Sequence, residues 1–311
     1  MVINAMTDHA ALTAAAAELT AAYPAITKST LGKSVLGREI IMLSAGSAEA
    51  EKSVLYVGAY HATEYITAAV LLRFLADLGE AAEKGLSICG VNVKRMLERR
   101  RIYVVPMVNP DGVELHLHGV GEGCVLAPRL AAMSRGDYSH WQANARGVDL
   151  NHNHNARFYE YKTIEAERGI VPGPTLWSGV APESEPETQA ICALLRYDAS
   201  VRTVLSLHTQ GEVIYCGGVK AASAEQRGGG EDAPVGSRSL GRTLSRMTGY
   251  SLDEADGTAA YGGLVDWYVR QFGRPGFTLE CGRGENPLPP EQALAIYARL
   301  REALFCAPYL V

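Results

Sequence analysis

The sequence predicts an α/β fold in which helices flank a largely parallel sheet. Short apolar runs rich in β-branched residues alternate along the chain with longer segments whose apolar residues recur at helical spacing. Glycine, proline and acidic residues separate these runs, as they do at turns and helix starts. Strands that alternate with helices favour parallel pairing, because each crossover helix returns the chain to the same edge of the sheet.

The predicted elements follow in chain order. The alanine-rich N-terminal segment is expected to be a helix capped near Thr7 or Asp8. Asn-Pro-Asp-Gly at 109–112 is a strong turn signal after an apolar run. Two long connections, 113–147 and 220–236, interrupt the alternation, and connections of this length are often functional. The sequence predicts strands within 53–60, 101–112, 201–216 and 276–282, and helices within 66–85, 182–198 and 289–307.

Bulk properties limit the domain organisation and the class of protein. The 311 residues contain no evident repeat or low-complexity linker, so one domain over 1–311 is expected, with 1–22 as a helical extension. The net charge of -5, without a long basic run, argues against a nucleic-acid partner. No stretch approaches the ~20 apolar residues of a membrane span and the N-terminus lacks a signal-peptide pattern, which predicts no membrane partner and a cytoplasmic location. The cysteines form no CxxC pairs and are expected to be reduced thiols.

Polar side chains that suit a catalytic metal follow three of the predicted strands. His61 and Glu64 stand three residues apart after the first strand, although alone they also fit a solvated helix start. His208 ends another strand, where a single histidine is more often a hydrogen-bonded core residue. Together, two histidines and one carboxylate form a zinc site whose fourth position is open for water.

A further carboxylate, Glu280, ends the strand in TLECG. Burying a carboxylate after an apolar strand is costly unless it has a partner. Glu280 is therefore either a base beside a bound cation or a structural glutamate held by a buried arginine.

Two histidine pairs with i,i+2 spacing are alternative metal candidates: His116 with His118, and His152 with His154. This spacing places both rings on one face of an extended segment. The simpler interpretations are an exposed strand edge for the first pair and a polar loop for the second, because the other set already accounts for the chemistry.

Several motifs together resemble the zinc carboxypeptidase family. The similarity is greatest to its bacterial branch of γ-D-glutamyl-diaminopimelate peptidases, which trim peptidoglycan stem peptides, and it extends from about residue 23 to the C-terminus. The resemblance implies a mixed sheet of roughly eight strands flanked by helices. The motifs are HATEYIT, NPDG, WQANARGVDLN, SEPET, HTQGEVIY and PGFTLECGRGENPLP.

The resemblance also implies roles for individual residues. One zinc ion per chain would be bound by His61, Glu64 and His208. Glu280 would be the general base that deprotonates the zinc-bound water and then protonates the leaving amine. Arg146 is the candidate cation for the carbonyl oxygen, with a structural surface arginine as its alternative, and Tyr261 is the candidate for the active-site tyrosine of the family.

One position departs from the family pattern. Carboxypeptidases have an Asn-Arg pair that grips the carboxylate of the substrate C-terminus, whereas this chain has Asn151 followed by His152. An imidazole cannot form the bidentate, permanently charged clamp of a guanidinium. Asn151 and His152 are still expected to contact the substrate, but its carboxylates should lie elsewhere.

These observations predict a zinc-dependent amide hydrolase that cuts the γ-D-glutamyl to meso-diaminopimelate, or L-diamino acid, bond of stem peptides. Its partner would be a muropeptide or small peptide, and the sequence leaves the oligomeric state open. A metallocarboxypeptidase or an N-acyl amino acid deacylase would use the same zinc site. From another class, an inactive muropeptide-binding module would keep the same fold, although the retained ligands and base argue against it.

Overall fold

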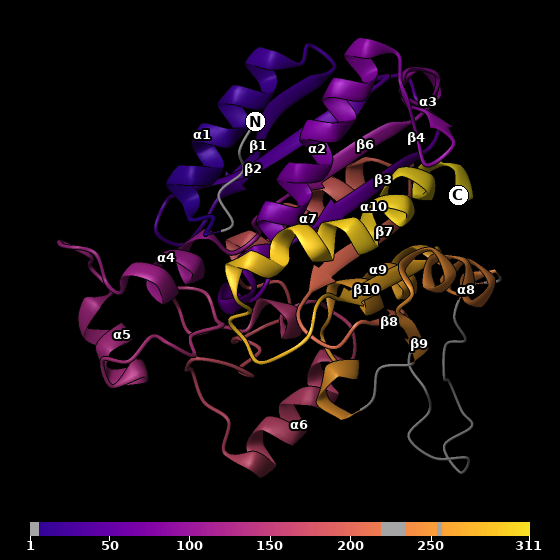
Figure 1. Ribbon diagram of the computed structural model, residues 1–311. Helices are drawn as coiled ribbons and strands as arrows, with labels where there is room; N and C mark the ends of the chain where they lie inside the picture. The colour runs from indigo at the N-terminus through magenta and orange to yellow at the C-terminus, as the bar shows by residue number, and fades with distance from the viewer. Residues whose placement is uncertain (1–5, 219–233, 235, 254–256) are drawn as a thin grey trace, which may run out of the picture.

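The computed structural model describes residues 6–218, 234, 236–253 and 257–311, and a mixed sheet runs through this part of the chain (Figure 1). The strand order is β1-β2-β6-β3-β7-β10-β8-β9. The central pairs β6–β3, β3–β7 and β7–β10 are parallel, whereas β1, β2 and β8 run antiparallel to their inner neighbours. The α/β prediction is confirmed, and the sheet is mixed, as the resemblance implied. The strands are β1 (Ile26–Lys33), β2 (Glu39–Gly46), β3 (Ser53–Val57), β6 (Arg101–Val105), β7 (Val201–His208), β8 (Val213–Cys216), β9 (Ser251–Asp253) and β10 (Gly276–Glu280), and β4 (Ser87–Ile88) pairs with β5 (Val91–Asn92) in a separate hairpin.

Three strands that are far apart in the sequence end at one edge of the sheet. β3, β7 and β10 are adjacent and parallel, with Val57 opposite Ser206 and Glu280 opposite His208. Ligand sites of α/β sheets lie outside the carboxyl ends of the strands. The sheet therefore brings the segments that follow these strands to a common place.

Helices cover both faces of the sheet, because successive side chains of a strand point to opposite faces. In β3, Val54 and Tyr56 belong to one hydrophobic core, and Leu55 and Val57 belong to the other. Figure 1 shows α2 and α10 lying across one face. The first core includes α1 (His9–Ala22), α2 (Ile66–Lys84), α3 (Val93–Arg99), α8 (Ser237–Thr248) and α10 (Ala293–Leu310), and the second includes α7 (Pro186–Tyr197) and α9 (Leu264–Phe272).

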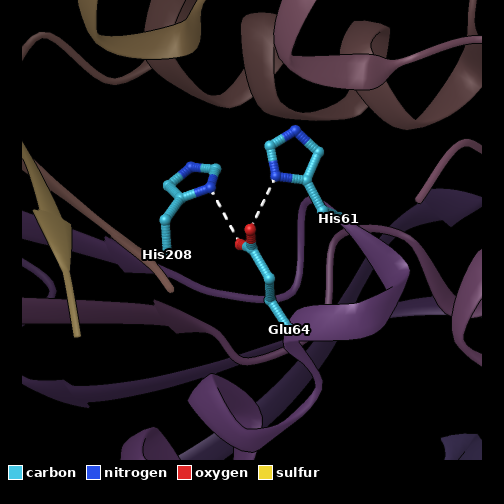
Figure 2. Close-up of side chains that lie close together, drawn as sticks. All are labelled: His61, Glu64 and His208. Carbon is cyan, nitrogen blue, oxygen red and sulfur yellow. Dashed lines mark hydrogen bonds and ion pairs between the residues drawn. The ribbon is translucent and has the colours of Figure 1, made fainter. Parts of the chain in front are cut away.

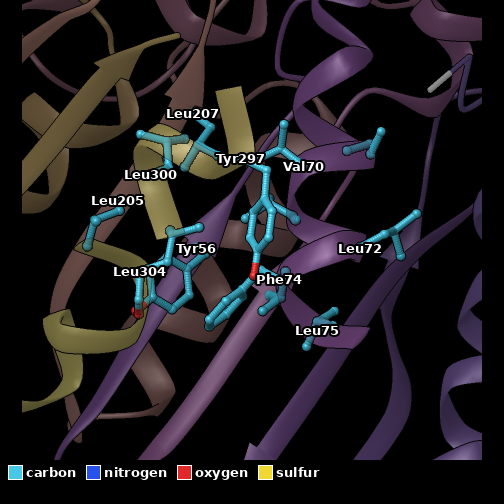
Figure 3. Close-up of a cluster of buried hydrophobic side chains, with 14 of the residues drawn as sticks. Tyr56, Val70, Leu72, Phe74, Leu75, Leu205, Leu207, Tyr297, Leu300 and Leu304 are labelled. Atoms are coloured by element: carbon cyan, nitrogen blue, oxygen red, sulfur yellow. The ribbon is translucent and has the colours of Figure 1, made fainter. Parts of the chain in front are cut away.

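Aromatic side chains join α2 and α10 to β3 in the larger core (Figure 3). The rings of Tyr56 and Phe74 meet edge to face with centroids 5.3 Å apart, and Phe74 meets Phe305 at 5.0 Å. Tyr56 donates its hydroxyl hydrogen to the carbonyl of Leu304 at 2.7 Å, so its buried polar atom has a partner. This packing fixes β3, the strand that leads to His61.

Helix ends confirm two expected boundaries. Asp8 is the N-cap of α1, and its side chain accepts the backbone N–H of Ala11 at 2.7 Å. α2 ends at Gly85, whose φ of 65° is left-handed, as glycine at a helix C-terminus allows. The helices predicted within 182–198 and 289–307 are α7 and α10.

The segment after β6 differs from the prediction. Asn-Pro-Asp-Gly begins the helix α4 (Pro110–His118), because Asn109 caps the N–H of Gly112 at 2.9 Å and proline suits the first helical turn. His116 and His118 therefore lie on a helix, where i,i+2 side chains do not face each other. The expectation that they share a face of an extended segment is wrong.

The two long connections have different outcomes. Within 113–147 the chain completes α4 and forms α5 (Ala127–Ser134), and α6 (Phe158–Arg168) follows soon after. The segment 220–236 lies almost wholly outside the described residues. All six cysteines are free thiols, as expected. In the described part of the chain, every helix is too short or too polar to cross a membrane.

Candidate metal centre

His61 and Glu64 reach the carboxyl edge of the sheet through a tight turn after β3. Thr67, in the first turn of α2, holds this turn: its hydroxyl accepts the N–H of Ala59 at 2.8 Å and donates to the carbonyl of Glu64 at 2.8 Å. Gly58 leaves space for this contact, because a Cβ there would lie 2.9 Å from Thr67 Oγ1. Glu64 ends the short helix η1 (Ala62–Glu64), so the two side chains converge.

His208, the last residue of β7, completes the cluster (Figure 2). Nδ1 of His61 lies 2.9 Å from Glu64 Oε1, and Nδ1 of His208 lies 3.0 Å from Glu64 Oε2. The three potential ligand atoms all lie within 4.8 Å of one another. Two imidazole nitrogens and one carboxylate oxygen are the donors of a catalytic zinc. The structure therefore brings the three predicted ligands together.

The cluster fits a zinc ion in two respects. Glu64 is buried, and its Oε2 makes no hydrogen bond of good geometry and has His208 Nδ1 at 3.0 Å, so a cation between these atoms would give this oxygen a partner. Nε2 of His61 lies 3.2 Å from Asp149 Oδ1, and Nε2 of His208 lies 3.1 Å from Ser206 Oγ. Because Nε2 of each ring already has a partner, Nδ1 is the nitrogen that can bind the metal. Partners of this kind orient histidines that bind metals.

The cluster concentrates charge in a buried space. Burial alone would lower the pKa of His61, but the carboxylates of Glu64 and Asp149 outweigh it and hold that pKa well above its usual value. Burial alone would raise the pKa of Glu64 and of Asp149, but the neighbouring histidines outweigh it and lower both. Both carboxylates are therefore ionised near neutral pH and favour a cation between the rings.

Glu280 lies beside this cluster at the end of β10, with His208 opposite it in the adjacent strand. Burial raises the pKa of Glu280 to about 7; the charge of Glu64 adds to this shift, while His208 and His61 oppose it. A carboxylate with a pKa near neutrality can both accept and return a proton. Glu280 also borders a small cavity of about 60 Å³, with Asn151, Tyr215, Cys216, Gly217, Ala259, Gly263, Val265, Asp266 and Thr278.

Two other predicted residues have partners of their own. Arg146 pairs with the buried Glu185 at 3.4 Å, and its side chain remains 46% exposed. The hydroxyl of Tyr261 accepts a hydrogen bond from Arg157 Nη2 at 3.2 Å, and its ring lies 6.0 Å from that of Tyr161. Their roles in catalysis remain predictions.

The conspicuous histidines of VDLNHNHN have different surroundings. His152 is buried, stacks on Tyr161 with centroids 4.3 Å apart, and lies 2.7 Å through Nδ1 from the carbonyl of Tyr261. His154 is fully buried, with Tyr60 at 3.2 Å and Cys192 at 3.4 Å. The two rings therefore have separate partners and do not form a metal pair with each other.

Sequence reasoning missed three side chains near the site: Asp149, Arg157 and Asp266. Asp149 lies within the quoted GVDLN motif, and an acid flanked by apolar residues was the signal that could have identified it. Asp266 follows an apolar pair in LVDW in the same way. Arg157 carried no local signal, because its contact with Tyr261 joins two segments that lie far apart in the sequence.

A zinc ligand set with one position left open is characteristic of zinc metallopeptidases, which hydrolyse peptide bonds. The family model for zinc carboxypeptidases matches residues 12–302. The chain therefore belongs to the zinc carboxypeptidase family.

Individual relatives agree with this assignment. Gamma-D-glutamyl-L-diamino acid endopeptidase 1 of Lysinibacillus sphaericus is 33% identical over 297 residues, which cover 94% of this chain and 70% of the relative. Murein peptide amidase A of Escherichia coli (strain K12) is 29% identical over 173 residues, 53% of this chain and 52% of the relative. The bovine thrombin-activatable fibrinolysis inhibitor, in complex with tick carboxypeptidase inhibitor, has the same fold, with a TM-score of 0.69 at 19% identity over 98% of this chain and 95% of that chain.

Proposed function

We propose that this zinc peptidase cleaves the γ-D-glutamyl to meso-diaminopimelate, or L-diamino acid, bond of peptidoglycan stem peptides. The observation that carries the proposal is the environment of His152. Burial lowers the pKa of its imidazole, so the ring is neutral near pH 7 and cannot act as the charged clamp of a carboxypeptidase. The names of the similar endopeptidase and murein peptide amidase support the same substrate class.

The cavity beside Glu280 supports a diamino-acid residue on the leaving side of the bond. Its volume of about 60 Å³ has room for about four waters, close to the size of a linear amine side chain. Asp266 lines it, is buried, and accepts the Gly218 N–H at 3.3 Å. A buried carboxylate suits the ammonium group of such a side chain.

The chain's own residues divide the chemical work. His61, Glu64 and His208 would hold one zinc ion, which supplies a Lewis acid and lowers the pKa of water from about 15.7 to about 7. Glu280 takes a proton from the attacking water and returns it to the leaving amine. Asp149 orients His61, and Asn151 and His152 contact the substrate. Arg146 and Tyr261 are the proposed groups for the carbonyl oxygen and the substrate.

Mass spectrometry of the products formed from defined muropeptides tests the proposal. Free tripeptide and tetrapeptide should be cut between D-glutamate and the diamino acid, and a zinc chelator should stop the reaction. Preferred cleavage of ordinary L-peptides or N-acyl amino acids would instead identify a carboxypeptidase or a deacylase. Zinc-loaded protein that binds muropeptides without cutting them would be an inactive binding module.

Intact sacculi provide a second comparison, because the expected cytoplasmic location implies that the substrates are released fragments. We expect free peptides to be cut much faster than sacculi. Efficient digestion of sacculi would contradict a role in fragment turnover inside the cell.

A further inference from the structure

Four planar side chains form a column beside the cluster of His61, Glu64 and His208. His152 stacks on Tyr161 with an angle of 6° between the rings, and Tyr161 stacks on Tyr261 at 26°. The guanidinium of Arg157 lies 4.3 Å from the centre of the Tyr261 ring and donates to its hydroxyl at 3.2 Å. A cation over an aromatic face is attracted to it, so the column holds Arg157 in a defined position.

The segment 261–263 connects this arginine to the cavity beside Glu280. The carbonyl of Tyr261 lies 2.7 Å from His152 Nδ1. A Cβ at Gly263 would lie 3.2 Å from Asp266 Oδ2 and 3.6 Å from Asn151 Oδ1, and both residues line the cavity. The positive charge of Arg157 also opposes the burial that raises the pKa of Asp266 to about 6. Arg157 is therefore close enough to the cavity for its charge to act on Asp266.

The surrounding charges make this cation significant. Glu64, Asp149, Asp266 and Glu280 line or border the site, and an acidic cleft repels a carboxylate on the substrate. The positive charge of Arg157, which acts on Asp266, offsets this repulsion, and a guanidinium can bind a carboxylate through two parallel hydrogen bonds.

Arg157 is also free to exchange its present partner. Its Nε donates to Glu160 Oε2 at 2.6 Å and its Nη2 contacts the same oxygen; the Arg157 side chain is 17% exposed, but that of Glu160 is 57% exposed, so water screens this pair and can replace the carboxylate. Arg157 has a left-handed φ of 55° at the N-cap of α6, a conformation that is uncommon for an arginine. A non-glycine side chain at a strained backbone position favours a functional role.

We infer that Arg157, rather than His152, anchors a free carboxylate of the diamino-acid residue in the substrate. The inference rests on the proposed function and names the group that replaces the missing arginine clamp. Two carboxylates qualify, the α-carboxylate of the residue and, in meso-diaminopimelate, the carboxylate at the end of its side chain.

Three probes with the zinc-loaded enzyme separate these cases. In γ-D-glutamyl-L-lysine, the diamino-acid residue has its α-carboxylate. In γ-D-glutamyl-meso-diaminopimelate with an α-amide, that residue has only the side-chain carboxylate, and in γ-D-glutamyl-L-lysine amide it has no free carboxylate. The wild-type enzyme should prefer at least one carboxylate probe. Arg157→Met should lower kcat/KM for that probe by about 10- to 100-fold, chiefly through KM, and should leave the amide nearly unchanged.

Matched variants control for structural effects. Arg196 is a second arginine that pairs with a glutamate, Glu183, and lies over an aromatic ring, Trp267, and Arg196→Met should leave all three rates unchanged. Arg157→Gly relieves the left-handed backbone and should show the same selective loss as Arg157→Met if the methionine variant does not fold.

Equal losses on all three probes, no loss on any, or a wild-type enzyme without carboxylate preference would each overturn the inference. A wild-type enzyme that cuts none of the probes but cuts ordinary peptides would instead overturn the proposed function.

Discussion

Asp149 shows how one carboxylate can serve both the fold and the candidate metal site. Its Oδ2 accepts the N–H of Leu176 at 3.0 Å, and its Oδ1 accepts the N–H of Asn151 at 3.1 Å while facing His61 Nε2 at 3.2 Å. These bonds fix the carboxylate before any metal binds. The orientation of the His61 ring is therefore determined by a residue that need not contact the ion.

Asp149→Asn should weaken zinc binding by about 10- to 100-fold, because an amide is a poorer acceptor for His61 and does not increase the basicity of its ring. Competition with a chromogenic chelator would measure the affinity. Asp198→Asn is a suitable control, since Asp198 also accepts a backbone N–H, from Ser200 at 2.9 Å, and lies on a different segment. Unchanged zinc affinity in the Asp149 variant would contradict the proposed orienting role.

Glu280→Gln should retain zinc and lose about 10²- to 10⁴-fold in hydrolysis rate, because the amide cannot accept the proton of the attacking water. Metal analysis and rates on one muropeptide would be measured on the same preparation. Glu280→Asp keeps the carboxylate but moves it back by one methylene, so an intermediate rate is expected. A glutamine variant that holds zinc and reacts at the wild-type rate would exclude Glu280 as the base.

At the scale of elements, the start of α7 joins distant parts of the chain. Asn144 Nδ2 donates to Glu185 Oε2 at 2.8 Å and to Glu187 Oε2 at 3.2 Å, and the N–H of Val35 donates to Glu187 Oε1 at 3.1 Å. All three side chains of this network are buried. The SEPET motif therefore attaches α7 to the loop after β1 and to the segment that leads to Asp149.

The pH dependence of the stability of the Glu187→Gln variant tests this network. Burial raises the pKa of Glu187 to about 7 from 4.5, against hydrogen bonds from its own backbone, Val35 and Asn144. Because the folded protein holds this proton more tightly than the unfolded chain does, the associated stability is complete below about pH 4.5 and is lost as pH rises through about 7. The free energy of unfolding of the variant minus that of the wild type should therefore increase by on the order of 2 kcal/mol when the pH is raised from about 5 to about 8.

Urea unfolding at both pH values would measure this difference. Glu291→Gln removes an exposed carboxylate and should show no such change. A Glu187 variant whose stability relative to wild type is independent of pH would show that the buried carboxyl does not titrate in this range.

The elements also show which local signals were sufficient. α2 could be predicted because its apolar periodicity and terminal Gly85 are local features, and both are observed. The start of α4 was missed because Asn-Pro-Asp-Gly is a turn signal that equally supplies an N-cap at Asn109 and a proline in the first turn. Whether such a turn continues as a helix depends on the packing of residues such as Val113 and Leu115.

At the scale of the molecule, the sequence identified the strand ends but not their neighbours. His61, His208 and Glu280 each follow an apolar run, which is a local pattern. That β7 lies between β3 and β10 is a long-range result of sheet assembly and is not encoded in any window of the sequence. The position of Arg157 against Tyr261 is equally long-range, so it became visible only in the folded chain.

Removing the metal should affect both activity and the stability of the whole molecule. The proposed ligands lie on β7 and on the turn after β3, so an ion bound there would link two central segments of the sheet. A ligand present at about 1,000 times its Kd stabilises the folded state by about 4 kcal/mol. Chelation should therefore lower the melting temperature by roughly 6 °C and abolish hydrolysis, and one equivalent of zinc per chain should restore both. His208→Ala should melt at the same temperature with and without chelator, so an equal chelator effect in this variant, or no effect on the wild type, would place the metal elsewhere.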